Sequence, residues 1–285
     1  MTYASAVDTT TYGEYRVPDT PGPLLRFTGR LGTAEHPAVA GRYHLYAGWF
    51  CPWSQRVLIT RALAGRTDDV SVSYVDDRRD GRGWAFRTEH GPDPVNGFAL
   101  LREAYEATTA GFDGHVSVPT LWDRTAHRVV SNDYRTIGID LATRFRDERP
   151  RTATYPPGRA AEIEDLDAWL GPAVNHGVSR AATDPVARRT LLDAFAALDA
   201  RLADRRYLLG DTLTEADVRL WVTLVRYDVG PNATRAISPG LAVHPHLWAY
   251  ARALYRIPAF RDTTRFASFT APGATVPAWD EEVTR

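Results

Sequence analysis

Apolar side chains follow two different periods along this chain, and the change between them divides it into two regions. Between residue 42 and about residue 145, segments that alternate apolar and polar residues are interleaved with segments whose apolar residues recur every three or four positions. Alternation predicts strands, and the longer spacing predicts helices. From about residue 158 onward only the helical spacing remains. We therefore predict an α/β region followed by an all-helical one.

The pattern of the first region predicts the element order β-α-β-α-β-β-α, which is typical of a small mixed sheet covered by helices. Strands are expected at 42–46, 70–75, 118–123 and 128–130, the last two as a hairpin around 125–127. Helices are expected to begin at Pro52, near Leu100 and at Asp133. Residues 1–41 contain several prolines and no sustained period, so we expect an irregular N-terminal extension that wraps over the domain surface.

The second region carries helical spacing at 163–170, 191–202, 214–225 and 246–255. Thr214 and Asp217 form a capping-box pattern at the start of the third of these helices. Charged residues, prolines and glycines accumulate between 146 and 157, which indicates a domain boundary. The chain is therefore divided into an extension at 1–41, an α/β domain at 42–146, a helical domain at 158–270 and a C-terminal tail at 271–285.

The composition excludes several classes of protein. A net charge of −1 gives no electrostatic reason to expect nucleic acid or an anionic membrane as a partner. No apolar run approaches the roughly 20 residues that span a bilayer, and the first residues lack the features of a signal peptide. A single cysteine excludes an intramolecular disulfide, which fits the reducing cytosol. We expect a cytoplasmic globular protein.

The single cysteine, Cys51, lies between a predicted strand and a predicted helix, directly before Pro52. This order places a thiol at a helix N-terminus, where unpaired N–H groups and the helix dipole favour the reactive thiolate. Proline suits the first helical turn, because its missing N–H would have no partner there. The alternative is a buried, inert cysteine. Position 54 is serine, so any resolving thiol has to come from another molecule.

These features together resemble the thioredoxin fold followed by the helical domain of the glutathione S-transferase superfamily. Val118-Pro119 is similar to the cis-proline signature of that fold. More narrowly, the chain resembles the Xi class, the glutathionyl-hydroquinone reductases, over residues 40 to 260. The motifs that carry this resemblance are Arg42-Tyr43-His44-Leu45-Tyr46, Cys51-Pro52-Trp53, Gly83-Trp84-Ala85-Phe86, Val118-Pro119-Thr120-Leu121-Trp122-Asp123, Gly210-Asp211, Thr214-Glu215-Ala216-Asp217-Val218-Arg219-Leu220 and Arg226-Tyr227-Asp228.

The resemblance implies roles for several residues. Cys51 matches the family's nucleophile, which attacks a glutathione thioether on a hydroquinone and is released by a second glutathione. Trp84 and the backbone of Val118 match parts of the site for the thiol cosubstrate. The family's Glu-Ser pair, which holds the amino-acid head of glutathione, is replaced here by Asp133-Tyr134. Aspartate keeps the charge with a shorter reach, and tyrosine puts a ring where a small hydroxyl is expected.

The segments that contact the quinone in the family also differ. Asn175-His176-Gly177-Val178-Ser179-Arg180 replaces a segment that ends in Tyr-Lys, and 263–269 replaces a His-Tyr-Tyr segment. Both changes remove phenols suited to a ketone or hydroquinone oxygen. We therefore expect the thiol chemistry to persist and the electrophile to differ.

Four further side chains have both a functional and a structural interpretation. Arg56 either assists the thiolate or a cosubstrate carboxylate, or is a solvated surface arginine. Trp53 either stacks on a flat substrate or packs under its helix. Trp84 follows glycines on a loop, which favours a site residue over a core residue. Asp133 either binds the cosubstrate or serves only as a helix N-cap.

The sequence offers no clear metal site. The histidines have no ligand spacing, and the closest pair, His244 and His246, lies in an expected turn before a helix, so we expect no metal. There is also no phosphate-binding glycine loop and no G-x-S-x-G motif.

The leading hypothesis is a thiol-dependent reductase or transferase in which Cys51 attacks a thioether or mixed disulfide of an aromatic or quinone-like substrate. The cosubstrate is glutathione or another small thiol. All basic residues are arginine, which is typical of a high-G+C genome, and bacteria of that kind use thiols such as mycothiol. One alternative is a transferase that conjugates a bound thiol without covalent catalysis. Another is a non-catalytic binding protein that kept the fold. The fold usually forms homodimers, so we expect one here.

Overall fold

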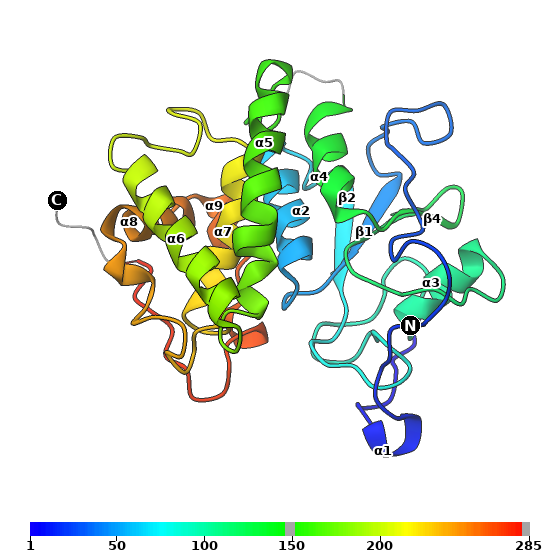
Figure 1. The fold of residues 1–285 in the computed structure, drawn as a ribbon. Coiled ribbons are helices and arrows are strands. Elements are labelled where there is room, and N and C mark those ends of the chain that lie inside the picture. The colour runs from blue at the N-terminus through cyan, green and yellow to red at the C-terminus, as the bar shows by residue number, and fades with distance from the viewer. Residues whose placement is uncertain (146–151, 281–285) are drawn as a thin grey trace. The chain divides into compact units, whose positions relative to one another are not determined.

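The computed structural model describes residues 1–145 and 152–280 (Figure 1). The chain separates into two compact units, Met1–Arg151 and Thr152–Arg285, and each is described by itself. The first unit includes the N-terminal extension together with the α/β region.

From residue 42 onward the first unit has the expected order β-α-β-α-β-β-α. Its elements are α1 Thr9–Tyr12, β1 Tyr43–Ala47, α2 Pro52–Leu63, β2 Val70–Tyr74, α3 Leu101–Thr108, β3 Thr120–Asp123, β4 Arg128–Ser131 and α4 Tyr134–Thr143. The four strands form one mixed sheet in the order β2-β1-β3-β4. Strand β1 runs parallel to β2 and antiparallel to β3, and β3 runs antiparallel to β4.

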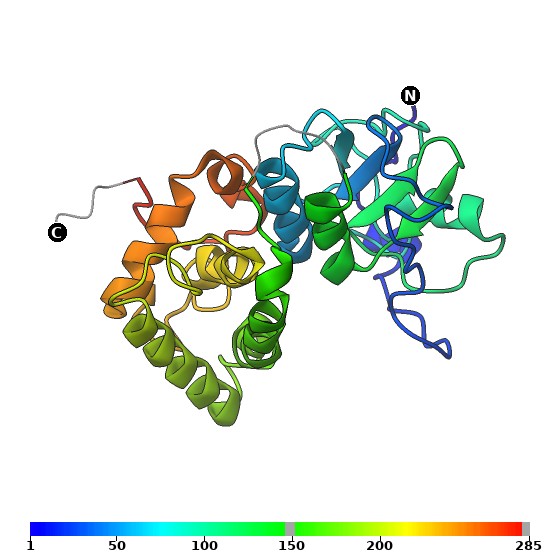
Figure 2. The same ribbon diagram turned by 90° about the horizontal axis from the view of Figure 1, so that it is seen from above.

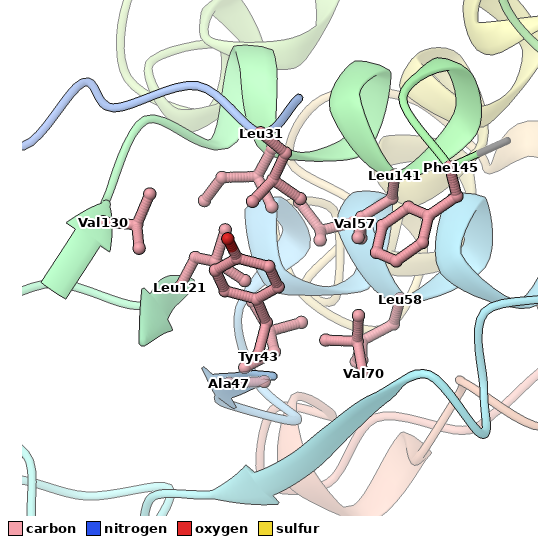
Figure 3. Packing of buried hydrophobic residues seen from close by; sticks show 12 residues of the cluster. Leu31, Tyr43, Ala47, Val57, Leu58, Val70, Leu121, Val130, Leu141 and Phe145 are labelled. Atoms are coloured by element: carbon pink, nitrogen blue, oxygen red, sulfur yellow. The ribbon is translucent and has the colours of Figure 1, made fainter. Parts of the chain in front are cut away.

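Successive strand residues point to opposite sides of this sheet, and helices cover both sides, so both faces are buried. On one face Tyr43, Leu121 and Val130 pack against Val57 of α2 and Leu141 of α4, as Figure 3 shows. On the other face Tyr46, Trp122 and Val129 join Leu101, Ala104 and Tyr105 of α3. Figure 1 shows α2 and α4 side by side on the first of these faces.

The N-terminal extension is more ordered than expected. Residues 9–12 form a short helix, which begins because the carboxylate of Asp8 accepts hydrogen bonds from the N–H groups of Thr10 and Thr11. Further along, Arg30 makes a two-point hydrogen-bonded ion pair with Asp140 of α4, at 2.9 and 2.6 Å. A four-residue helix has too few positions to display a helical period, so the sequence pattern could not reveal it.

The second unit is helical, as expected. Its elements are η1 Pro157–Arg159, α5 Ala160–Leu170, the π-helical turn η2 Gly171–Asn175, η3 Gly177–Ser179, α6 Pro185–Arg201, α7 Glu215–Tyr227, η4 Leu241–Val243, α8 Pro245–Tyr255, α9 Pro258–Arg261 and η5 Phe266–Ser268. Every residue of α7 is buried, and Figure 2 shows this helix in the middle of the unit, among α5, α6 and α8.

The predicted capping box is present at the start of α7. Asp217 accepts hydrogen bonds from the backbone N–H groups of Thr214 and Leu208 and from the hydroxyl of Tyr250, at 2.8, 2.9 and 2.8 Å. One detail of the sequence interpretation is wrong: His246 lies inside the first turn of α8, because Pro245 begins that helix and His244 is its N-cap. Within residues 1–145 and 152–280, every helix is too short or too polar to cross a bilayer.

We predict that Asp217→Ala lowers the free energy of unfolding by about 2–4 kcal/mol, because four buried donors, the Thr214 hydroxyl included, lose their acceptor together. Asp211→Ala is the matched control, since Asp211 is an exposed acid a few residues away. Urea unfolding of both variants measures the difference. Equal midpoints for the two variants would contradict the assigned role of Asp217.

His44 predicts how stability depends on pH. Its ring nitrogens each lie 2.8 Å from a serine hydroxyl, of Ser71 and Ser73, and burial lowers its pKa from 6.5 to about 3. The unfolded chain therefore binds a proton at this site before the folded chain does. Stability should fall as the pH drops from 6.5 toward 3, by up to about 1.4 kcal/mol per pH unit from this group.

The check is the slope of unfolding free energy against pH between 6.5 and 4. The slope should be shallower in His44→Gln, which keeps a polar side chain but does not titrate. The same slope in both proteins would mean that His44 makes no contribution.

Candidate active site

Four loops meet at one edge of the sheet because of the strand directions. Strands β1, β2 and β4 all run toward this edge, and β3 runs away from it. Residue 51 follows β1, the loop from 75 onward follows β2, and Asp133 follows β4, while Val118 precedes β3. The register pairs Tyr46 with Thr120 across β1 and β3, which brings the segments of Cys51 and Val118 together.

Cys51 is the N-cap of α2, as predicted. Its Sγ accepts a hydrogen bond from the backbone N–H of Ser54 at 3.4 Å. In the thiol form the same sulfur donates to the carbonyl of Val118 at 3.5 Å. The Val118-Pro119 peptide bond is cis, as its motif indicated. The sulfur is thus held by a helix N-terminus, which favours the thiolate, beside the loop that precedes β3.

Aromatic stacking joins the first turns of α2 and α4. The rings of Trp53 and Tyr134 are stacked with centroids 4.6 Å apart. The guanidinium of Arg56 lies over both, 5.2 Å from the Trp53 centroid and 5.6 Å from that of Tyr134. Arg56 is only 3% exposed, so the interpretation of a solvated surface arginine is wrong. Cation–π contact with two rings accommodates the buried guanidinium.

Asp133 serves as a helix N-cap, the structural one of its two interpretations. It is the N-cap of α4 and accepts a hydrogen bond from the backbone N–H of Arg135 at 3.1 Å. The side chain of Arg135 also donates to both carboxylate oxygens, at 2.8 Å each. The carboxylate therefore already has three donors from its own helix, which reduces its capacity to hold a ligand's ammonium group.

Trp84 lies on the loop that follows β2 and stacks on Phe50, the residue before Cys51, with ring centroids 4.4 Å apart. Both rings pack on the buried cluster that includes Cys51. The guanidinium of Arg79 lies over two rings, 4.6 Å from the centroid of Trp84 and 4.1 Å from that of Tyr15. Sequence reasoning missed Phe50, Arg79 and Tyr15; adjacency to the cysteine was the one signal, and it applied only to Phe50.

The structure thus places five of the six candidate residues, all but Trp84, at the N-terminal turns of two adjacent helices or at the loop before β3. Trp84 reaches the same edge of the sheet through Phe50. Within the second unit, Ser179 is exposed in η3, and its hydroxyl donates to the carbonyl of His176 at 2.8 Å. Phe269 lies under the guanidinium of Arg226 at 4.2 Å. Neither segment offers a phenol.

One cluster in the part of the chain that the structure describes has the ligand types of a cation site. The ligand atoms of Asp76, Glu89 and His90 lie within 4.8 Å of one another. Asp76 already pairs with Arg87 at 3.0 Å. A hydrogen bond with Asp76 raises the pKa of the Glu89 carboxyl. The expectation of no metal stays a prediction.

Comparison with known proteins agrees with this architecture. A family model described as "Glutathione S-transferase, C-terminal domain" matches residues 157–253. The chain is 33% identical over 250 residues to the glutathionyl-hydroquinone reductase YqjG of Escherichia coli (strain K12), covering 84% of this chain and 76% of that protein. Against the glutathione-bound structure of YqjG the TM-score is 0.80, with 30% identity and 86% of each chain covered.

A Xi class GST from Natrialba magadii has a TM-score of 0.81 and 31% identity, covering 90% of this chain and 91% of that one. The expected thioredoxin-like domain and helical transferase domain are therefore confirmed. Given this identity over most of its length, the chain belongs to the glutathionyl-hydroquinone reductase family, the Xi class of the glutathione S-transferases.

Proposed function

We propose that this protein is a thiol-dependent reductase in which Cys51 removes a thiol substituent from an activated, quinone-like aromatic ring. The observation that carries the proposal is the position of the Cys51 sulfur, at the N-terminus of α2 and next to the carbonyl of Val118. Relatives named as glutathionyl-hydroquinone reductases support the same chemistry. The expected homodimer and cytoplasmic location stay predictions.

The reaction balances in two steps. The Cys51 thiolate attacks the sulfur of the thioether, an S–S bond forms, the C–S bond breaks, and the ring carbon takes a proton. The product is a hydroquinone without its substituent and a mixed disulfide at Cys51. A second small thiol, as thiolate, attacks this disulfide, which restores the Cys51 thiolate and releases an oxidised thiol dimer. Overall, one free thiol and the thioether sulfur are joined as a disulfide, and one C–S bond is reduced to C–H.

The cosubstrate is glutathione or another small thiol. The solved YqjG structure contains glutathione, which supports the first choice. Two features of this chain change the site that, by the resemblance, holds the amino-acid head of glutathione. The Asp133 carboxylate is engaged by Arg135, and the ring of Tyr134 is stacked on Trp53. We infer weakened recognition of that head, which leaves mycothiol as the competing thiol.

The first prediction concerns covalent exchange. Oxidised glutathione or oxidised mycothiol should add a single thiol to the protein, and the corresponding reduced thiol should remove it. Cys51→Ser should abolish the adduct completely, because serine is not a nucleophile toward disulfides at neutral pH. Intact-protein mass measures both, and circular dichroism checks that the variant folds.

The same protein samples are then assayed with a glutathionylated hydroquinone. Release of the free hydroquinone should stop in Cys51→Ser. Retained conjugation of a thiol to an electrophile in that variant would instead support a non-covalent transferase. A wild-type protein that forms no adduct with either thiol would contradict the proposal and favour a binding protein.

The second prediction concerns Tyr134. Tyr134→Ser should increase the rate of adduct formation with oxidised glutathione several-fold, because it replaces the stacked ring with a small hydroxyl. Tyr134→Phe is the matched control, since it keeps the ring and should leave the rate unchanged. Intact-protein mass measured on samples quenched at successive times gives both rates. An equal increase in the two variants would show that the ring does not obstruct the cosubstrate.

A further inference from the structure

The loop that follows β2 is dense in charge, and its acids are already paired. Asp76 pairs with Arg87 at 3.0 Å, and Asp77 pairs with His90 at 3.1 Å. Asp80 pairs with Arg82 at 2.7 Å and with Arg87 at 3.4 Å. The hydrogen bonds from Arg82 hold the pKa of Asp80 well below its usual range. Asp76, Asp77 and Asp80 therefore each have a basic partner other than Arg79.

Arg79 lies among these groups but forms no ion pair with any acid of the described residues. Its guanidinium lies over the rings of Tyr15 and Trp84, and within residues 1–145 no carboxylate or hydrogen-bond acceptor contacts it. The side chain is half-buried, and burial lowers the pKa of the guanidinium while leaving it charged at neutral pH. A partly desolvated cation without a counter-ion is unusual, because surrounding acids normally compensate for lost hydration.

The N-terminal extension holds this arrangement in place. The hydroxyl of Tyr15 is hydrogen-bonded to the ring of His115 at 2.7 Å. The backbone N–H of Gly81 donates to the carbonyl of Gly13 at 2.6 Å. A side chain at position 81 would put its Cβ 1.9 Å from the carbonyl oxygen of Tyr12, so only glycine permits this approach. The extension is thus fastened to the loop directly before Tyr15.

The array connects directly to the nucleophile. Trp84 stacks on Phe50 at 4.4 Å, and Phe50 precedes Cys51 in the chain. Arg79 is therefore separated from the residue next to the nucleophile by one indole ring. In glutathione, carboxylates lie several bonds from the sulfur.

We propose that Arg79, positioned by Tyr15 and Trp84, binds a carboxylate of the thiol cosubstrate and thereby selects carboxylate-bearing thiols. This inference rests on the proposed function, because it assigns the ligand of that same site. A guanidinium offers five N–H donors in a planar fork, which matches the two oxygens of a carboxylate. Mycothiol joins cysteine to a sugar and has no free carboxylate, so it would gain nothing from Arg79.

The test compares disulfides with and without carboxylates on the full chain. Rates of adduct formation at Cys51 are measured by intact mass with oxidised glutathione, with oxidised glutathione whose carboxylates are esterified, with oxidised mycothiol and with cystamine. Arg79→Gln should slow the reaction with oxidised glutathione by about tenfold or more, the worth of a charge-assisted hydrogen bond. The rates with the three other disulfides should stay unchanged.

Arg78→Gln is the matched control, because it removes the same charge from an exposed neighbouring position. It should keep the wild-type preference for oxidised glutathione over its ester. Arg79→Lys should restore part of the preference, since it keeps the charge without the fork. Tyr15→Ala should reduce the preference while leaving the cystamine rate intact, which a merely structural role would not do.

The outcomes separate the two proposals. The same preference in wild type, Arg79→Gln and Arg78→Gln would overturn the assignment of Arg79 and leave the function of Cys51 standing. Equal rates for oxidised glutathione and its ester in the wild type would overturn it as well. No adduct with any disulfide, cystamine included, would overturn the proposed function itself.

Discussion

Burial of the sheet on both faces is the constraint on which the rest of the first unit depends. Helices cover one face and α3 covers the other, so groups that meet a ligand have to leave the sheet at an edge. The strand directions bring the ends of β1, β2 and β4 and the start of β3 to one such edge. Cys51 and Val118 are far apart in sequence, and the register of two strands is what makes them neighbours.

The local pattern was enough to predict much of the fold. Alternation located the strands, and a capping signature located the start of α7. The lone cysteine before a proline was placed correctly as a helix N-cap. Contacts between residues distant in sequence were not predictable. The partnership of Tyr15 with His115 and that of Trp53 with Tyr134 depend on tertiary packing, which has no period along the chain. The interpretation of Arg56 as a solvated surface residue was wrong for the same reason, since its burial also depends on tertiary packing.

The exclusive use of arginine has structural consequences that lysine could not reproduce. A planar guanidinium can lie on aromatic rings, as those of Arg56, Arg79 and Arg226 do. It can also be buried where several carboxylates share it: Arg219 is 3% exposed and contacts Glu164 and Asp167 at 3.0 and 3.3 Å. A composition that reflects the origin of the sequence therefore also determines how charge is accommodated inside both units.

The single thiol gives this chain one specific attachment site for a spectroscopic probe. Cys51 is 6% exposed, so an alkylating dye can reach the sulfur only when the surrounding side chains move aside. With one cysteine in the sequence, any fluorophore or spin label attached through sulfur reports on this position alone. The labelling rate, compared with that of a free thiol, then measures how often the Cys51 sulfur becomes accessible. No cysteine has to be removed by mutagenesis before such an experiment.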